Sequence, residues 1–134
     1  MSVVLDTHAL IWLLVSSDRL GRRAEKRIDE AFRNSLVIVS ATSFWEVGML
    51  VGKRRIDVGK PMDQWRADAL RLGIEEIPLD GEIAVKSVDL AELHGDPADR
   101  FIAATAIRVN APLVTADANL LAWKGPLACI DARV

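Results

Sequence analysis

Apolar residues along the chain fall into two alternating patterns. Short runs rich in Val, Ile and Leu are typical of buried strands, and longer segments carry apolar residues every three or four positions, as one face of a helix does. The short runs predict strands at residues 3–5, 36–39, 74–79, 112–116 and 127–130. The longer segments predict helices at residues 7–15, 21–34, 40–55, 62–72, 81–93, 96–110 and 118–123. Strands that alternate with helices form βαβ units and hence a parallel sheet.

The segment at residues 36–39, Leu-Val-Ile-Val, indicates how the sheet is covered. Every position in it is apolar, which is typical of a strand buried on both faces. We therefore expect an α/β fold, namely a three-layer α/β/α sandwich with a central parallel sheet of four or five strands. The chain has 134 residues, which suits one domain spanning residues 1–134 and is too short for two ordinary ones.

Charge is distributed unevenly along the chain. The 17 Lys and Arg residues against 19 Asp and Glu residues give a formal net charge of −2. Residues 1–60 hold ten basic and seven acidic side chains, whereas residues 61–134 hold seven and twelve. The sum argues against a uniformly basic nucleic-acid binder. A basic front half still leaves contact with phosphate open.

Cysteine usage and hydropathy narrow the setting of the protein. Cys129 is the single cysteine, which excludes an intramolecular disulfide and a Cys-based zinc site, and its apolar neighbours suggest a buried thiol in a strand. The longest apolar run, residues 9–15, is too short to span a bilayer. No basic segment precedes the first apolar stretch, so the start of the chain does not look like a signal peptide. We expect a cytoplasmic protein without a membrane partner.

Four acidic residues lie where a parallel sheet would bring them together. Asp6 and Asp117 directly follow predicted strands, Glu46 lies about one turn into the helix after another strand, and Asp99 lies near the start of a later helix. Ligands of open parallel sheets bind at the carboxyl ends of the strands. Oxygen-only ligand sets of this kind suit Mg²⁺ or Mn²⁺.

Each of these acids also has a purely structural interpretation. Asp6 and Asp117 are suitable N-caps for the helices that follow them. Asp96, Pro97 and Asp99 have the spacing of a capping box, which favours a structural role for Asp99 taken alone. Glu46 stands among apolar residues, where a carboxylate is costly unless it is compensated or solvated. The combination of the four acids is more informative than any one of them.

Four motifs resemble those of a known family. Residues 6–13 (Asp-Thr-His-Ala-Leu-Ile-Trp-Leu), 43–47 (Ser-Phe-Trp-Glu-Val), 96–103 (Asp-Pro-Ala-Asp-Arg-Phe-Ile-Ala) and 114–117 (Val-Thr-Ala-Asp) resemble the PIN-domain family, and within it the VapC-type toxins of bacterial toxin–antitoxin pairs. The resemblance covers essentially the whole chain, in order. It implies a PIN-like fold and a metal-dependent endoribonuclease that uses Mg²⁺ or Mn²⁺. It also implies a homodimer that a cognate antitoxin holds inactive.

The resemblance assigns Asp6, Glu46, Asp99 and Asp117 to the family's acidic quartet, with Asp96 as a helix cap. Cleavage of a phosphodiester requires an activated water and stabilisation of the charge that develops at phosphorus, and one or two bound ions supply both. We expect Asp6 and Asp99 to ligate the tighter ion directly. Glu46 and Asp117 are expected to complete the shell, directly or through water, or to orient the nucleophilic water.

Further residues are candidates for substrate contact. Thr7 and Thr115 are placed to hydrogen-bond carboxylates or phosphate, although a Thr after a strand is more often a cap. Arg100 is expected either to contact phosphate or to form an ion pair within the site. The cluster Lys53, Arg54 and Arg55 leaves the helix that carries Glu46 and is a candidate for contact with the RNA backbone, against the default of a solvated helix face.

The four tryptophans are assigned by the helices in which they lie. Trp12 and Trp45 occupy apolar helices, which predicts core or subunit-interface positions. Trp65 and Trp123 are expected to be more exposed, although Trp65, Ala69 and Leu72 share one face of the predicted helix at 62–72. Apolar helix faces in the first 60 residues are candidates for an antitoxin groove or a dimer surface.

Two other functions compete with the ribonuclease interpretation. An aspartyl-phosphate hydrolase or receiver-like domain also carries an Asp after its first strand. However, Asp6-Thr7-His8 lacks the second Asp that such phosphatases carry two positions on, and no Lys follows a late strand as a receiver requires. A non-catalytic PIN-like module that binds RNA or protein is the second alternative, against which the presence of all four acids argues.

Overall fold

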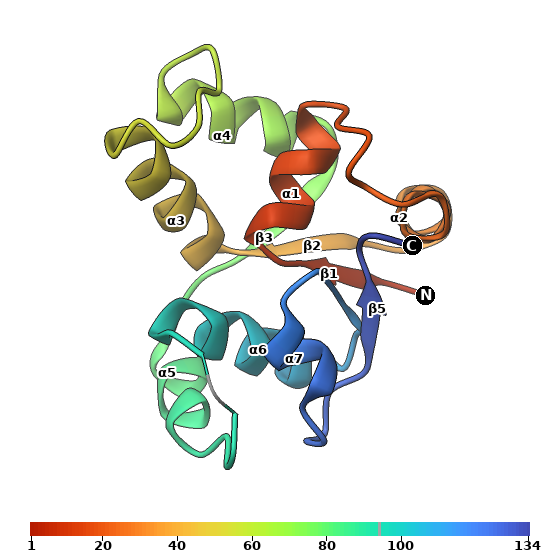
Figure 1. Ribbon diagram of the computed structural model, residues 1–134, viewed down its shortest axis with the longest axis vertical. Helices are drawn as coiled ribbons and strands as arrows, with labels where there is room; N and C mark the ends of the chain where they lie inside the picture. Colours follow the sequence, from red (N-terminus) through yellow and green to blue (C-terminus); the bar gives the residue numbers. More distant parts are fainter. Residues whose placement is uncertain (94) are drawn as a thin grey trace.

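A single twisted sheet organises the chain, and its strands all run in the same direction (Figure 1). The computed structural model describes residues 1–93 and 95–134. Within these ranges the strands are β1 (Val3–Leu5), β2 (Val37–Ser40), β3 (Ile74–Ile77), β4 (Leu113–Thr115) and β5 (Cys129–Asp131). Their order across the sheet is β3-β2-β1-β4-β5. Because β1 lies at the centre, its carboxyl end adjoins the carboxyl ends of both β2 and β4.

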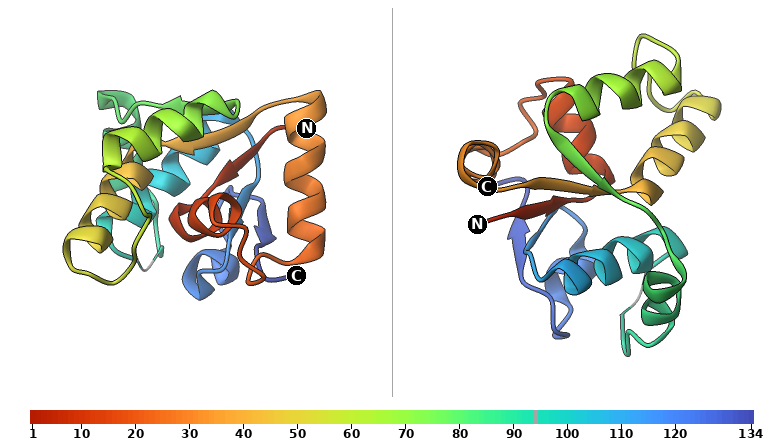
Figure 2. Two further views of the ribbon diagram at one scale, coloured as in Figure 1. Left: turned by 90° about the horizontal axis from the view of Figure 1, so that it is seen from above. Right: turned by 180° about the vertical axis from the view of Figure 1, so that it is seen from behind.

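Helices connect the strands and cover both faces of the sheet (Figures 1 and 2). In the described ranges they are α1 (Thr7–Leu14), α2 (Arg22–Asn34), α3 (Ala41–Gly52), α4 (Met62–Arg71), α5 (Gly81–Val88), α6 (Pro97–Val109) and α7 (Ala118–Ala122). In this part of the chain, none of them is long and apolar enough to cross a membrane.

Alternate residues of the strands build two separate cores. Val3 and Leu5 of β1 pack with buried residues of α1, α2, α3 and α4 on one face. Val4, the residue between them, packs with α5, α6 and α7 on the other face. β2 is completely buried, with Val37 and Val39 on the first side and Ile38 on the second. The predicted three-layer sandwich with a parallel sheet is therefore confirmed, including its fifth strand.

One helix boundary and the burial of one residue differ from the prediction for identifiable reasons. The helix predicted at 81–93 ends at Val88, where the Arg100 side chain donates hydrogen bonds to the carbonyl groups of Val88 and Leu90. Leu72, expected on the inner face of its helix, is 64% exposed, since it lies at the C-cap of α4 where the chain turns toward β3.

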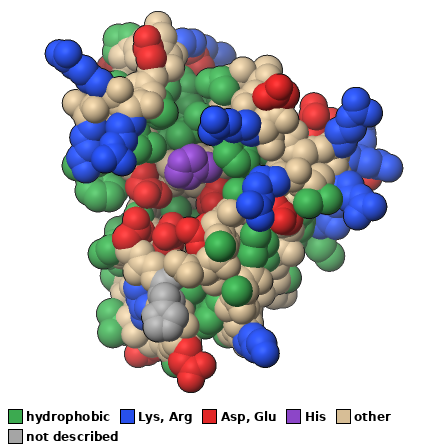
Figure 3. Space-filling view, viewed as in Figure 1, with side chains coloured by type: hydrophobic (Ala, Val, Ile, Leu, Met, Phe, Trp, Pro, Cys, Tyr) green, Lys and Arg blue, Asp and Glu red, His purple; other side chains and the backbone are tan. Residues whose placement is uncertain are grey.

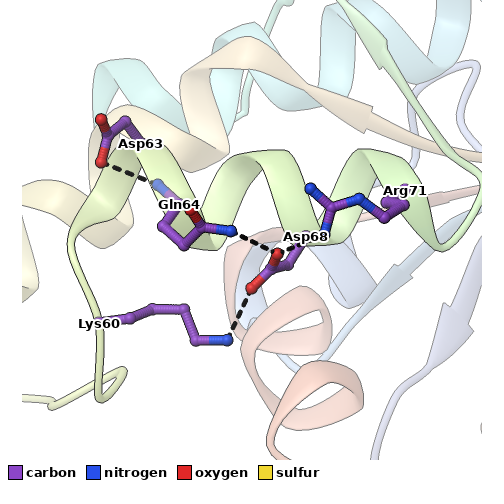
Figure 4. A network of polar contacts seen from close by, with 5 residues as sticks. All are labelled: Lys60, Asp63, Gln64, Asp68 and Arg71. Atoms are coloured by element: carbon purple, nitrogen blue, oxygen red, sulfur yellow. Dashed lines mark hydrogen bonds and ion pairs between the residues drawn. The ribbon is translucent and has the colours of Figure 1, made fainter.

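The exposed face of α4 carries a polar network centred on Asp68 (Figure 4). The Asp68 carboxylate accepts hydrogen bonds from Lys60 at 2.7 Å, Gln64 at 2.8 Å and Arg71 at 2.9 Å. These bonds hold the pKa of Asp68 below its usual value. The network ties the connection between α3 and α4 to α4 itself, and it engages Lys60 away from the edge of the sheet that carries the acidic residues.

The start of α2 is held by the last residues of the chain. Gly21, the residue before α2, donates its N–H to the Ala132 carbonyl at 2.8 Å, and the first N–H groups of the helix, those of Arg23 and Ala24, donate to Val134. A Cβ at position 21 would lie 2.3 Å from backbone atoms of Val134. Only glycine permits this close approach of the two backbones.

Candidate active site

Asp6 occupies the carboxyl end of the central strand and is buried there, 6% exposed. One of its oxygens accepts the N–H of Ala9 at 2.9 Å and caps α1, as predicted from the sequence. The other accepts the hydroxyl of Thr115, which ends the neighbouring strand β4. Burial raises the pKa of Asp6, and these two hydrogen bonds oppose that rise. Asp6 is therefore both a helix cap and a fixed carboxylate at the middle of the sheet edge.

Glu46 reaches the same edge from α3. Its carboxylate accepts the hydroxyl of Thr7, and the Thr7 oxygen also lies 3.1 Å from the Ser43 hydroxyl. Thr7 thereby links the first turn of α1 to two successive turns of α3. Burial raises the pKa of Glu46, with a further contribution from the nearby Asp96. Glu46 is thus half-buried beside other acids and does not lie on a solvated helix face.

Asp99 lies in the first turn of α6, but its side chain does not cap the helix. Asp96 performs that function, since it accepts the N–H of Asp99 at 2.9 Å. Burial, the largest cause, and neighbouring carboxylates together raise the pKa of Asp99 to about 7. The carboxylates that contribute are, in decreasing order of effect, Asp96, Asp117, Glu46 and Asp6. The predicted quartet is therefore brought within electrostatic reach of one another, and Asp96 joins it.

Asp117 follows β4 and caps α7 by accepting the N–H of Leu120 at 3.0 Å. Its own N–H donates to the Thr115 hydroxyl at 3.0 Å. Thr115 consequently connects Asp6 to Asp117 through a single buried hydroxyl group. Thr7 and Thr115 were expected to hydrogen-bond either carboxylates or phosphate. In the structure, Thr7 donates to Glu46 and Thr115 donates to Asp6.

These acids have no arginine or lysine ion-pair partner in the described part of the chain, since no ion pair there includes Asp6, Glu46, Asp96, Asp99 or Asp117. Figure 3 shows acidic side chains gathered in a hollow on the face where α1 and α3 approach α6 in Figure 1. A hollow that concentrates carboxylates without arginine or lysine attracts cations.

The donor chemistry of this hollow fits a hard divalent cation, because every candidate ligand is a carboxylate oxygen. The side chains are not drawn together around a common point, however. Within residues 1–93 and 95–134, no group of at least three His, Cys, Asp or Glu side chains is arranged to hold a metal ion. The site therefore has the composition of a metal centre without a preformed ligand cage.

Arg100 differs from the sequence-based expectation. Its guanidinium donates hydrogen bonds to the carbonyl groups of Ser87, Val88, Leu90 and Leu93, at distances of 2.8 to 3.3 Å. The predicted ion pair within the site is wrong, because these carbonyls lie at the end of α5 and in the segment after it. Sequence adjacency to Asp99 was misleading, since neighbouring helical residues point about 100° apart.

The basic residues after α3 flank a groove that adjoins the acids. Lys53 and Arg55 line a cavity of about 660 Å³ between α3 and α6, to which Glu46 and Asp96 also contribute. Arg54 is exposed, has a left-handed backbone (φ 57°) and does not line the cavity. The structure thus brings Lys53 and Arg55 beside the candidate site and leaves Arg54 outside it.

Trp65 is buried where exposure was expected, and Trp45 is exposed, which contradicts the core alternative for it and leaves the subunit-interface alternative a prediction. Trp65 is 5% exposed and packs edge-on against Phe44, with ring centroids 6.0 Å apart. Trp45 is 61% exposed and lines the same cavity as Lys53. The apolar composition of α3 concealed this exposure, because α1, α6 and the sheet pack against other sides of the helix and leave Trp45 uncovered.

The parallel sheet and the acidic residues at its edge can be compared with known protein families. A parallel sheet with acidic residues at the carboxyl ends of its strands is the arrangement that the sequence predicted. Residues 3–124 match the family model of the PIN domain. The chain belongs to the PIN domain family.

Individual relatives agree with this assignment. The chain is similar to Ribonuclease VapC22 of Mycobacterium tuberculosis, at 32% identity over 126 residues that cover 93% of this chain and 94% of the relative. Its fold is similar to that in VapBC2 from Rickettsia felis bound to a DNA fragment from its promoter, with a TM-score of 0.72 at 20% identity, covering 97% of this chain and 98% of that one. The fold is also similar to that in VapBC-1 from nontypeable Haemophilus influenzae, with a TM-score of 0.67 at 20% identity, covering 98% of this chain and 98% of that one. The resemblance to VapC-type PIN domains is confirmed.

Proposed function

We propose that the chain is a divalent-metal-dependent endoribonuclease and the toxin component of a toxin–antitoxin pair. The observation that carries the proposal is the gathering of acidic residues at one sheet edge, where Thr115 contacts Asp6 and Asp117 and Thr7 contacts Glu46, without an arginine or lysine ion-pair partner among the described residues. The name of the Mycobacterium tuberculosis relative, a ribonuclease, supports the reaction class. The toxin–antitoxin complexes among the similar structures support the biological role.

The residues that would hold Mg²⁺ or Mn²⁺ are Asp6 and Asp99, completed by Glu46 and Asp117 directly or through water. Each hydrogen-bonded oxygen of Asp6 retains a second lone pair, so its bonds to Ala9 and Thr115 do not prevent ligation. Such an ion lowers the pKa of a bound water and neutralises charge on a phosphodiester. Because the side chains do not form a ready-made cage, binding is expected to require rotation of Glu46 or Asp99, or bridging waters.

The remaining polar residues of the site position these acids. Thr115 fixes the rotamer of Asp6, and its oxygen accepts the N–H of Asp117. Thr7 holds Glu46 toward the hollow instead of toward solvent. Preorganisation of this kind keeps carboxylate oxygens close to the place where positive charge and phosphate meet, so less reorganisation is needed when substrate binds.

The partners are part of the same proposal. RNA is the substrate, a cognate antitoxin protein is the inhibitor, a second copy of the chain completes a homodimer, and the protein acts in the cytoplasm. Single-stranded loops of RNA are the preferred target class, because their bases and backbone are accessible to a protein surface.

Substitution of Asp99 by Asn tests the reaction. Asp99→Asn keeps the size of the side chain and removes its charge, so metal-dependent cleavage of total RNA is expected to fall at least about 100-fold. Asp80→Asn is the matched control, because Asp80 caps α5 in the same manner as other acids here but lies outside the group that raises the pKa of Asp99. The measurement is cleavage by purified, antitoxin-free protein with Mn²⁺ or Mg²⁺, and with EDTA.

Three results separate the competing functions. Cleavage that continues in EDTA, or that Asp99→Asn leaves unchanged, contradicts the metal-dependent mechanism. Binding of RNA without cleavage in either ion identifies a non-catalytic module. Hydrolysis of a phosphomonoester such as p-nitrophenyl phosphate, with intact RNA, identifies an aspartyl-phosphate type of enzyme.

A further inference from the structure

The cavity between α3 and α6 begins at the acidic residues and continues away from them. Glu46 and Asp96 line one part of it, and Lys53 and Arg55 line another. Its volume of about 660 Å³ falls within the range of small-molecule and cofactor sites. The proposed reaction uses only the acidic part, so the rest of the cavity has no role in it.

The walls of this cavity are aromatic and apolar. Trp45 and Met49 contribute from α3 and Phe101 contributes from α6. Trp45 is 61% exposed and Met49 is 43% exposed, which leaves a large aromatic face in solvent directly beside Glu46 in the sequence. Exposed aromatic side chains adjacent to a charged cleft are characteristic of surfaces on which nucleobases stack.

The charges of the cavity follow one row of α3. Glu46, Leu50 and Lys53 are spaced i, i+4 and i+7 and share one side of the helix. Seven residues of α-helix separate Glu46 from Lys53 by about 10 Å along the axis. In the described residues, neither Lys53 nor Arg55 has an ion-pair partner. A ligand that extends from the acids thus meets first an apolar, aromatic wall and then two available cations.

Single-stranded RNA complements an aromatic wall followed by two cations. A nucleotide joins a flat apolar base to an anionic phosphate, and the phosphate spacing continues along the strand. An apolar protein segment complements the aromatic wall but leaves Lys53 and Arg55 unneutralised, and a duplex keeps its base faces stacked inside the helix. The combination of an aromatic face with cations therefore favours an unpaired nucleotide over an apolar protein segment.

We propose that the cavity between α3 and α6 is a nucleotide subsite, in which an unpaired base beside the scissile phosphate stacks on Trp45 while Lys53 and Arg55 neutralise the next phosphate. This subsite rests on the proposed ribonuclease function and adds to it the requirement for a single-stranded, unstacked nucleotide next to the cleavage point. Trp45 acts in substrate binding and takes no part in bond cleavage.

The test measures binding separately from cleavage. In protein carrying Asp99→Asn and without added metal, affinity is measured by fluorescence anisotropy for a short single-stranded RNA and for the abasic ribose-phosphate oligomer of the same length. Trp45→Ala is expected to weaken binding of the intact RNA about 5- to 100-fold and to leave the abasic oligomer unaffected. Trp45→Phe, which retains an aromatic face, is expected to restore most of the affinity.

Leu72→Ala is the matched control, because Leu72 is a similarly exposed apolar side chain that does not line the cavity. It is expected to change neither affinity. Equal losses for the intact and abasic oligomers with Trp45→Ala overturn the subsite, and so does a change of oligomeric state in that variant by analytical ultracentrifugation, which identifies the cavity as a protein interface.

The outcome for the subsite is independent of the outcome for the reaction. If the unsubstituted protein cleaves RNA with Mn²⁺ and Trp45→Ala leaves both affinity and KM unchanged, the subsite is wrong and the ribonuclease function stands. If the unsubstituted protein fails to cleave, the ribonuclease function is wrong, and the difference between intact and abasic RNA still decides whether Trp45 stacks on a base.

Discussion

The Asp99 carboxyl is the residue at which burial and crowding act together. Its pKa of about 7, against 3.8 for an ordinary Asp, means that the folded protein without metal retains a proton that the unfolded chain has released. Burial and like charges also raise the pKa values of Asp6 and Glu46, in the same direction. The acidic hollow therefore makes folding and protonation interdependent.

Stability of the metal-free protein is expected to fall as pH rises. Between pH 3.8 and about 7 the folded state binds more protons than the unfolded state, so each increase in pH lowers the free energy of unfolding. The stabilisation is complete below the unfolded pKa and is lost as the pH passes through about 7. Thermal unfolding in EDTA from pH 5 to pH 8 measures it, and Asp99→Asn is expected to flatten the dependence. Identical slopes for the two proteins would contradict the assigned pKa.

The Thr115 hydroxyl is a second residue-scale feature with a measurable consequence. Thr115→Val removes the donor to Asp6 and the acceptor for the Asp117 N–H in a fully buried position, so a loss of about 1–3 kcal/mol in unfolding free energy is expected. Thr105→Val is the control: its equally buried hydroxyl only donates to the Phe101 carbonyl within α6, and its loss is expected to cost much less. Urea denaturation compares the two, and equal costs would argue against the Thr115 bridge.

The position of a single residue could be predicted where it depended only on the strand that directly precedes that residue. Asp6 and Asp117 each follow a strand directly, so the strand assignments placed them at the same edge. The contribution of Asp96 to the electrostatics, the carbonyl partners of Arg100 and the exposure of Trp45 depend on how α6 and α3 are oriented. Those orientations result from tertiary packing, which the local sequence does not specify.

At the scale of elements, adding a methyl group is expected to change the free energy of unfolding in opposite directions at Gly48 in α3 and at Gly21 before α2. Gly48 lies inside α3 with open space where a Cβ would stand, so Gly48→Ala is expected to raise unfolding free energy by about 0.5–1 kcal/mol. Gly21→Ala places a Cβ against the Val134 backbone and disturbs the bonds at the start of α2, at an expected cost of about 2–4 kcal/mol. Differential scanning calorimetry of both variants is the measurement, and a stabilising Gly21→Ala would contradict the close approach.

Sequence periodicity determined the elements more reliably than their ends. The strand at residues 36–39 was predicted as buried on both faces, and β2 is buried throughout because helices cover both sides of the sheet. The end of α5 could not be predicted, because it depends on a guanidinium that arrives from α6, more than ten residues later in the chain. Long-range contacts of single side chains therefore limited the prediction of boundaries.

At the scale of the whole molecule, basic residues lie on separate surfaces. Figure 3 shows Lys and Arg side chains gathered at the edge where Figure 1 places α2, apart from the acidic hollow. Lys53 and Arg55 instead border the cavity beside that hollow. The net charge of −2 is therefore a poor guide to the charge that RNA would meet at any one surface.

This separation predicts which cations matter for RNA. Joint substitution Lys53→Gln and Arg55→Gln is expected to weaken binding of single-stranded RNA and to reduce the slope of log K against log salt by about 0.7, the value for the one phosphate that the two cations neutralise in the proposed subsite. Joint substitution of the exposed Arg22 and Lys26 of α2 by Gln is the control and is expected to preserve the slope. Binding titrations over a range of salt concentrations measure both, and equal reductions would indicate a diffuse basic surface.

The order of the strands gives the chain a natural point of division. Across the sheet, β3, β2 and β1 are neighbours in one half, and β4 and β5 form the other half. A chain break in the exposed residues 78–80 therefore divides the protein into two pieces that meet along the β1–β4 pairing. The first piece carries Asp6 and Glu46 and the second carries Asp99 and Asp117. Neither fragment expressed alone is expected to be harmful to a cell. Under the proposed toxin function, co-expression of fragments fused to two interacting proteins is expected to restore growth inhibition, which would make the fold a complementation reporter.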